Sequence, residues 1–157
     1  MRTMILLDHV GFSEQSYEII KEVNLTVEDS TEEISIVVND VSTKIMEVNT
    51  AVNNIAEIGC FQDGALIATS VLNASQILSA CTSARKILYL WDLDWVFMPF
   101  NYSWLYDTLN DNRLEIVVRS EQHAKALKTL CGKEPVGILE QFKLEKLWNL
   151  LESTKTK

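Results

Sequence analysis

Cysteine, histidine, proline and glycine are all scarce in this chain of 157 residues, which has 3 Cys, 2 His, 2 Pro and 5 Gly. The cysteines, Cys60, Cys81 and Cys131, form no C-x-x-C pair. The sequence therefore predicts neither a disulfide framework nor a zinc site, and it favours a reducing, cytoplasmic compartment. Two histidines leave little material for a His-based metal site. The low proline and glycine content excludes collagen-like chains and Pro/Gly-rich disorder.

Long apolar runs and basic patches are also lacking. The most apolar stretch, residues 87–100, is interrupted by Asp92 and Asp94, whereas a membrane span needs about 20 apolar residues. Residues 1–7 are too short for the apolar region of a signal peptide. The formal net charge is −8, and residues 1–80 hold 12 acidic but only 3 basic side chains. We therefore expect no membrane span and no nucleic acid partner, and solubility alone explains the acidity.

Short apolar runs alternate regularly with amphipathic stretches. Five runs are predicted strands, and a sixth candidate follows them: residues 3–7, 34–38, 65–69, 86–91, 114–118 and 136–139. The helices are predicted over residues 13–24, 70–83, 102–109, 120–131 and 144–151. Residues 41–62 fit either a helix, from the spacing of apolar residues between Ile45 and Ile58, or a short strand over 44–48.

The continuous apolar character of these strands is typical of a parallel sheet that is covered on both faces. Strands that alternate with helices form right-handed crossover units. We therefore predict one α/β domain over residues 1–152, a doubly wound, mainly parallel, Rossmann-like sheet with helices on both faces. Residues 153–157 are expected to form a frayed polar tail.

Ligands of such sheets bind beyond the carboxyl ends of the strands, so the polar residues there are the candidate site residues. They are Asp8, His9, Gly11, Asn39, Asp40, Ser70, Asp92, Asp94, Arg119 and Ser120. Helix capping alone explains Ser13, Ser70 and Ser120, and His123 is expected at the surface. The loop after the first strand has one glycine and is not G-x-G-x-x-G, and no Walker A sequence exists, so a usual nucleotide site is not expected.

Asp92 and Asp94 follow the fourth predicted strand with one residue between them. In an extended chain both carboxylates point the same way and can hold Mg²⁺ or Mn²⁺, as in the D-x-D of sugar-nucleotide transferases. The pattern also imitates the nucleophile loop of haloacid-dehalogenase-like phosphatases, but no Asp-Asp or Glu-Asp pair follows it. The third interpretation is that the aspartates cap the following turn or pair with Arg113 or Arg119.

Four aromatic residues lie near these aspartates: Trp91, Trp95, Tyr102 and Trp104. Their rings either stack on a sugar or belong to the core. His9 is a candidate general base beside a sugar hydroxyl. The sequence alone leaves both questions open.

Five segments, taken in order, resemble the N-terminal, acceptor-side domain of GT-B glycosyltransferases. They are DHVGFSEQSY, GALIATSVLNASQIL, KILYLWDLDW, IVVRSEQHAKAL and VGILEQFKLEKLW, and the likeness spans nearly the whole chain. The resemblance implies that Asp8 and His9 are catalytic and lie on the acceptor side of a cleft. It implies that the substrate-binding residues are Gly11, Ser70, Asp92, Asp94, Trp95, Arg119, Ser120 and Glu121, the last three near an interdomain face.

In that family a second domain binds most of the nucleotide-sugar donor, and we expect this chain to lack it. The leading hypothesis is a glycosyltransferase-like domain that binds a sugar or glycosylated acceptor, has no cofactor of its own and needs a partner domain for turnover. Two alternatives stay open. One is an acidic interaction protein that docks on another chain or on itself as a homodimer. The other is a small enzyme that uses Asp92 and Asp94 with Mg²⁺ or Mn²⁺.

Overall fold

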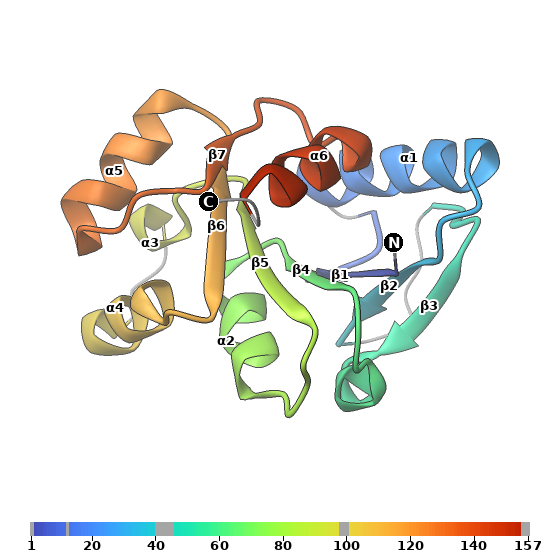
Figure 1. Ribbon diagram of the computed structural model, residues 1–157, viewed down its shortest axis with the longest axis horizontal. Helices are drawn as coiled ribbons and strands as arrows, with labels where there is room; N and C mark the ends of the chain where they lie inside the picture. The colour runs from blue at the N-terminus through green and yellow to red at the C-terminus, as the bar shows by residue number, and fades with distance from the viewer. Residues whose placement is uncertain (1, 12, 40–45, 98–100, 155–157) are drawn as a thin grey trace.

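One seven-stranded sheet forms the centre of the computed structural model, which describes residues 2–11, 13–39, 46–97 and 101–154. All seven strands run parallel, in the order β3-β2-β1-β4-β5-β6-β7 (Figure 1). The strands are β1 Thr3–Leu7, β2 Ile34–Val38, β3 Ala51–Asn54, β4 Ala65–Ala68, β5 Arg85–Leu90, β6 Leu114–Val118 and β7 Gly137–Ile138. The predicted Rossmann-like α/β fold is confirmed, and the strand order reverses between β1 and β4.

Helices cover both faces of the sheet, as Figure 1 shows. The helices are α1 Glu14–Asp29, the 3-10 helix η1 Ile55–Cys60, α2 Val71–Ser79, α3 Asp94–Phe97, α4 Tyr102–Asn110, α5 Glu121–Cys131 and α6 Leu144–Thr154. α1 and α6 lie side by side on one face, and α2, α4 and α5 cover the other. No helix in the part of the chain described here is long and apolar enough to cross a membrane.

Continuous apolar strands supply both cores because successive side chains point to opposite faces. Leu66 and Leu88 pack in the core beneath α2, whereas Ile67 and Ile87 pack in the core beneath α1. All four side chains are fully buried. Burial of each contributes about 1.5–3 kcal/mol, which explains why these segments form the central strands.

Three serines cap the helices that follow β1, β4 and β6, as the sequence predicts. The side chains of Ser13, Ser70 and Ser120 accept hydrogen bonds from backbone N–H groups in the first turns of α1, α2 and α5. Because β1, β4 and β6 are parallel, these three helix N-termini lie at the same edge of the sheet. This carboxyl edge therefore gathers the polar groups that the sequence analysis singled out.

The structure corrects the prediction for residues 41–62. Residues 46–48 are not a strand, and the helical spacing does not form a helix; instead β3 occupies residues 51–54 and η1 follows it. β3 is a short edge strand whose residues are exposed or half-buried, so it lacks the continuous apolar run of the other strands. Asn54 ends it, because its side chain accepts from the N–H of Ala56 and caps η1. Asp40 and residues 41–45 lie outside the described part.

Three helix boundaries also differ from the prediction. α1 continues to Asp29, whereas α2 ends at Ser79, after which Ala80 is extended. The hydroxyls of Thr82 and Ser83 then donate to backbone carbonyls of the loop before β4. α6 extends to Thr154, whose hydroxyl accepts a hydrogen bond from Arg85. The first two residues of the predicted frayed tail are thus helical, and residues 155–157 lie outside the described part.

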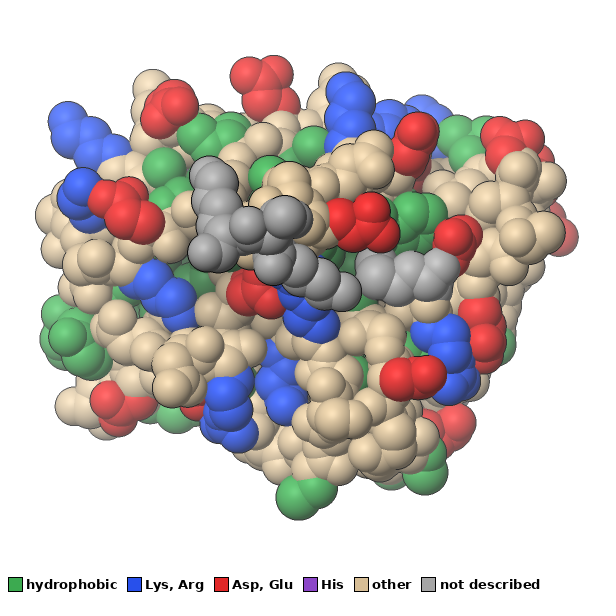
Figure 2. Space-filling view, in the orientation of Figure 1, with side chains coloured by type: hydrophobic (Ala, Val, Ile, Leu, Met, Phe, Trp, Pro, Cys, Tyr) green, Lys and Arg blue, Asp and Glu red, His purple; other side chains and the backbone are tan. Residues whose placement is uncertain are grey.

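Charges are mixed on the face of the molecule that Figure 2 shows. Acidic and basic side chains alternate over it, so the unequal charge of the two halves of the chain produces no single-sign patch on this face. Folding brings the acidic N-terminal half against basic side chains from later in the chain, as in the ion pair between Glu22 and Lys143.

We predict that Gly64→Ala destabilises the fold by about 2 kcal/mol or more. Gly64 has a φ of +88°, where a side chain costs about 1–2 kcal/mol, and a Cβ there would lie 2.3 Å from the carbonyl oxygen of Arg2. Gly59→Ala is the matched control, because a Cβ at Gly59 meets nothing within 4 Å. Urea denaturation of both variants measures the difference, and equal stabilities would contradict this account of the turn before β4.

Candidate functional site

Asp8, Ser70 and Asp94 meet where the strand order reverses. Asp8 follows β1, and its Oδ1 accepts a hydrogen bond of 3.2 Å from Ser70 Oγ at the end of β4. Asp94 Oδ2 accepts from the backbone N–H of Val71, the first residue of α2, at 3.0 Å. The parallel sheet thus brings together three predicted site residues that are separated by up to 86 positions (94 − 8) in the sequence.

The environment of Asp94 raises the pKa of its carboxyl group above the ordinary value of 3.8. Burial is the main cause, and the nearby carboxylates of Asp8 and Asp92 add to it, while the hydrogen bond from Val71 acts in the opposite direction. A helix N-terminus is a natural anion site. At α2 the protein's own carboxylate already occupies that position.

The extended D-x-D geometry that the metal hypothesis required is wrong. Asp94 begins α3, and Asp92 lies in the exposed bend before it, so the two carboxylates do not leave an extended strand side by side. Among the residues that the structure describes, no group of three or more His, Cys, Asp or Glu side chains is placed to hold a metal ion. Among the described residues neither aspartate forms the expected ion pair with an arginine, because Arg113 binds Asp111 and Arg119 lies over Trp91. Asp94 accepts from the first N–H of α2 instead.

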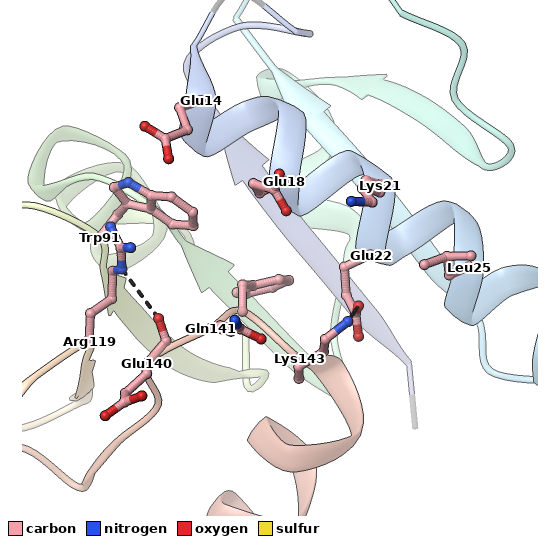
Figure 3. A pocket seen from close by; sticks show the side chains of 11 residues that line it. Glu14, Glu18, Lys21, Glu22, Leu25, Trp91, Arg119, Glu140, Gln141 and Lys143 are labelled. Atoms are coloured by element: carbon pink, nitrogen blue, oxygen red, sulfur yellow. Dashed lines mark hydrogen bonds and ion pairs between the residues drawn. The ribbon is translucent and has the colours of Figure 1, made fainter.

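A cavity of about 420 Å³ lies between α1, the carboxyl ends of β5 and β6, and the loop before α6 (Figure 3). Of the predicted site residues that the structure describes, only Arg119 lines it. The other lining residues are Glu14, Glu18, Lys21, Glu22 and Leu25 of α1, Trp91 after β5, and Glu140, Gln141, Phe142 and Lys143 before α6.

Aromatic rings form the floor of this cavity. Tyr89 lies edge-on to both Trp91 and Phe142, with ring centroids 6.2 and 5.0 Å apart. The Tyr89 hydroxyl donates to the carbonyl of Leu139 at 2.9 Å, and burial raises the pKa of this tyrosine, so it stays neutral. The guanidinium carbon of Arg119 lies 4.1 Å from the centre of the Trp91 ring.

The loop before α6 is held against α1 by Glu22. Its carboxylate forms an ion pair with Lys143 at 2.5 Å and accepts a hydrogen bond of 3.3 Å from the N–H of Leu144, the first residue of α6. Glu22 is nearly buried. The contact fixes the distance between the two walls of the cavity.

The aromatic residues near Asp92 do not form one sugar-stacking surface. Trp91 is only 7% exposed and belongs to the core beneath α1, while Trp95 and Trp104 pack against the core on the opposite face of the sheet. The guanidinium group of Arg119 lies over the Trp91 ring, so little of this indole is left accessible for a sugar ring. The core interpretation therefore holds for Trp91.

The remaining predicted residues stay apart from the cavity. His9 is exposed, and neither His9 nor Asp8 is among the described residues that line the cavity. Gly11 has a left-handed φ of 89° in the loop before α1. Ser120 caps α5, and Glu121 is exposed in its first turn. His123, expected at the surface, is half-buried.

Trp95 borders a second, apolar groove of about 550 Å³ between α3, α4 and α5. Leu93, Val96, Tyr102 and Leu130 also line it. Val96 and Tyr102 expose 63% and 60% of their surface. The groove lies on the face of the sheet opposite α1 and α6, so it is separate from the cavity.

Comparisons with protein-family models, with curated proteins and with solved structures find no match for this chain. Its own geometry is therefore the basis for assigning a function.

We predict that Asp94→Asn stabilises the protein at pH 7 relative to the unchanged chain, because the amide oxygen can still accept from Val71 without a buried charge. A carboxyl group whose pKa is raised by folding stabilises the fold below its unfolded pKa, and that stability is lost as the pH rises through the folded pKa. The gain should therefore vanish below about pH 3.

Asp94→Ala is the matched control, because it removes the acceptor of the Val71 N–H at the start of α2. It should be about 1 kcal/mol less stable than Asp94→Asn at both pH values, since neither variant carries the charge. Urea denaturation at pH 3 and pH 7 measures all three proteins. If Asp94→Asn is as destabilised at pH 7 as Asp94→Ala, the carboxylate is stabilising in its ionised form and this account of the site is wrong.

Proposed function

We propose that this chain is a glycosyltransferase-like domain that binds a sugar, free or at the end of a glycosylated acceptor, in the cavity between α1 and β5–β6. The observation that carries the proposal is the lining of this cavity. Planar hydrogen-bonding groups surround it, the carboxylates of Glu14 and Glu18 on one side and the amide of Gln141 with Arg119 on the other (Figure 3). Such groups pair with adjacent hydroxyls.

The size and position of the cavity support the same proposal. Its volume of about 420 Å³ falls in the range of small-molecule sites, which is about 300–1,000 Å³. It lies at the carboxyl edge of a parallel sheet, where ligands of such folds bind. The contacts of Glu22 hold the loop before α6 against α1, so the two walls of the cavity are in place before a ligand binds.

The acidic helix N-termini favour the acceptor over a nucleotide-sugar donor. α1 and α5 carry Glu14 and Glu121 in their first turns, and Asp94 occupies the N-terminus of α2. A pyrophosphate would be repelled by the nearby carboxylate at α1 and α5, and at α2 it would find the N–H of Val71 already bonded to Asp94. This arrangement supports a division of labour in which a partner domain binds the donor, so that the chain alone does not turn over.

Titration of the ¹⁵N-labelled protein with monosaccharides and with UDP- and GDP-sugars tests this function. We expect monosaccharides to shift the amide signals of Arg119 and Gln141, and nucleotide-sugars to gain no affinity from their diphosphate. Glu18→Ala and Gln141→Ala should each weaken sugar binding up to about tenfold, the worth of one hydrogen bond. Glu152→Ala, an exposed glutamate of α6 outside the cavity, is the control.

Two results would contradict the proposal. One is the absence of any monosaccharide binding at millimolar concentration. The other is tight nucleotide-sugar binding that the cavity variants do not change.

A second candidate function, a non-enzymatic interaction protein, is favoured by the apolar groove beside Val96 and Tyr102. Both side chains protrude next to the groove formed with Trp95 and Leu130. Across a two-fold axis, the protruding side chains of one copy can enter the groove of a second copy, and the reverse contact forms at the same time. The occupant we infer for this candidate function is therefore a second copy of the chain.

For this candidate we predict a dimer at tens of micromolar concentration that Val96→Asp dissociates, because the charge would be buried in the contact. Leu72→Asp is the control, since Leu72 is 47% exposed on α2 and does not line the groove. Sedimentation velocity distinguishes them. A wild-type protein that stays monomeric throughout this range rules out self-association through the groove.

A further inference from the structure

Arg119 is held rigidly within the cavity. Its guanidinium group lies 4.1 Å from the centre of the Trp91 ring, and its Nε–H donates to the carbonyl of Glu140 at 3.4 Å. Trp91 is itself fixed, because it is nearly buried and lies edge-on to Tyr89. A guanidinium group that lies over a fixed ring and donates from Nε to a backbone carbonyl has the orientation of its Nη edge restricted.

This arginine is the exception among the four of the chain. Arg2, Arg85 and Arg113 each form an ion pair with a carboxylate, at 3.0, 2.5 and 2.6 Å. Arg119 forms none with any residue that the structure describes, although the carboxylates of Glu14, Glu18 and Glu140 line the same cavity. Of its five N–H donors, the four on the Nη atoms therefore have no partner within the described chain.

Two parallel N–H donors of a guanidinium group match the two oxygens of a carboxylate. A phosphate has the same geometry, but the charges of the lining side chains oppose it. Four glutamates and three basic residues line the cavity, a net charge of −1 (3 − 4). A second negative charge on the ligand would meet these glutamates, whereas a single carboxylate on Arg119 leaves the remaining glutamates to accept from hydroxyls.

We propose that the sugar bound in this cavity is a sugar acid, and that Arg119 holds its carboxylate through paired hydrogen bonds. This inference rests on the proposed sugar-binding function and adds the class of sugar. Glu18 and Gln141 lie on opposite sides of the same cavity and bind the hydroxyl groups of the ring (Figure 3). The partner domain would then transfer its sugar to an acidic acceptor.

Calorimetric titration with two matched pairs of ligands tests the inference. The pairs are glucuronate with glucose, and galacturonate with galactose, each differing by one carboxylate. We expect the wild-type protein to bind the acid of at least one pair about tenfold or more tightly than the neutral sugar, as two charge-assisted hydrogen bonds allow.

Three variants test whether Arg119 is the source of the preference for the acid over the neutral sugar. Arg119→Gln should abolish the preference, so that this variant binds the acid no more tightly than the neutral sugar. Arg119→Lys, which keeps the charge but not the paired donors, should retain part of the preference. Arg113→Gln is the control, because Arg113 pairs with Asp111 outside the cavity, and it should change neither affinity.

Each other outcome is decisive. Equal binding of the acid and the neutral sugar by the wild-type protein overturns this inference and leaves the proposed sugar-binding function standing. Binding of neither overturns both. An acid preference that persists in Arg119→Gln and Arg119→Lys places the carboxylate elsewhere, and tighter binding of inorganic phosphate than of glucuronate assigns Arg119 to a different anion; both results overturn the inference.

Discussion

The common direction of the seven strands is the constraint on which the site depends. Because every strand is parallel to its neighbours, the N-termini of α1, α2 and α5 all meet the same edge of the sheet, each behind a serine cap. Their dipoles place partial positive charge there. Acidic side chains of the chain itself offset this positive charge, most directly the carboxylate of Asp94, which accepts from the first N–H of α2. The electrostatic attraction of this edge for a diphosphate is therefore weakened.

Within this acidic edge, Arg119 is the one cation among the described lining residues whose charge lies over an aromatic ring. Lys143 is paired with Glu22, and Lys21 of α1 has neither an ion pair nor a ring contact with a described residue to hold it in place. A ligand that satisfies both features carries hydroxyl groups for the glutamates and one negative charge for the guanidinium. The sugar-binding proposal and the assignment of a sugar acid thus follow from the same distribution of charge, although they fail under different experimental results.

Much of the fold could be predicted from the sequence because local signals agreed with one another. Residues 3–7 and 114–118 are fully apolar or nearly so, and Ser120 starts a helix that ends before Gly132. β3 could not be found in this way, because an edge strand with exposed residues has no continuous apolar run. α3 was missed as well, since four residues that begin with Asp94 resemble an extended metal motif more than a helix.

The site was less predictable because its contacts join distant segments. Arg119 could be placed at the carboxyl edge from the end of β6, but its contact with Trp91 depends on the register that pairs Leu90 with Val118. The α1 wall could not be assigned, because Glu18 and Glu22 are ordinary acidic residues of an amphipathic helix until the loop before α6 packs against them. One sequence feature did point to this site. Gln141 and Lys143 follow the last predicted strand, just as the candidate site residues follow the earlier strands.

The most direct test of the central claim is the detection of intermolecular nuclear Overhauser effects between a bound sugar acid and the protein. We predict contacts from the ring protons of glucuronate or galacturonate to the side chains of Phe142 and Leu25, which line the same cavity as Arg119. Contacts to Trp95 and Tyr102 instead would place the sugar in the apolar groove on the other face of the sheet and contradict the account.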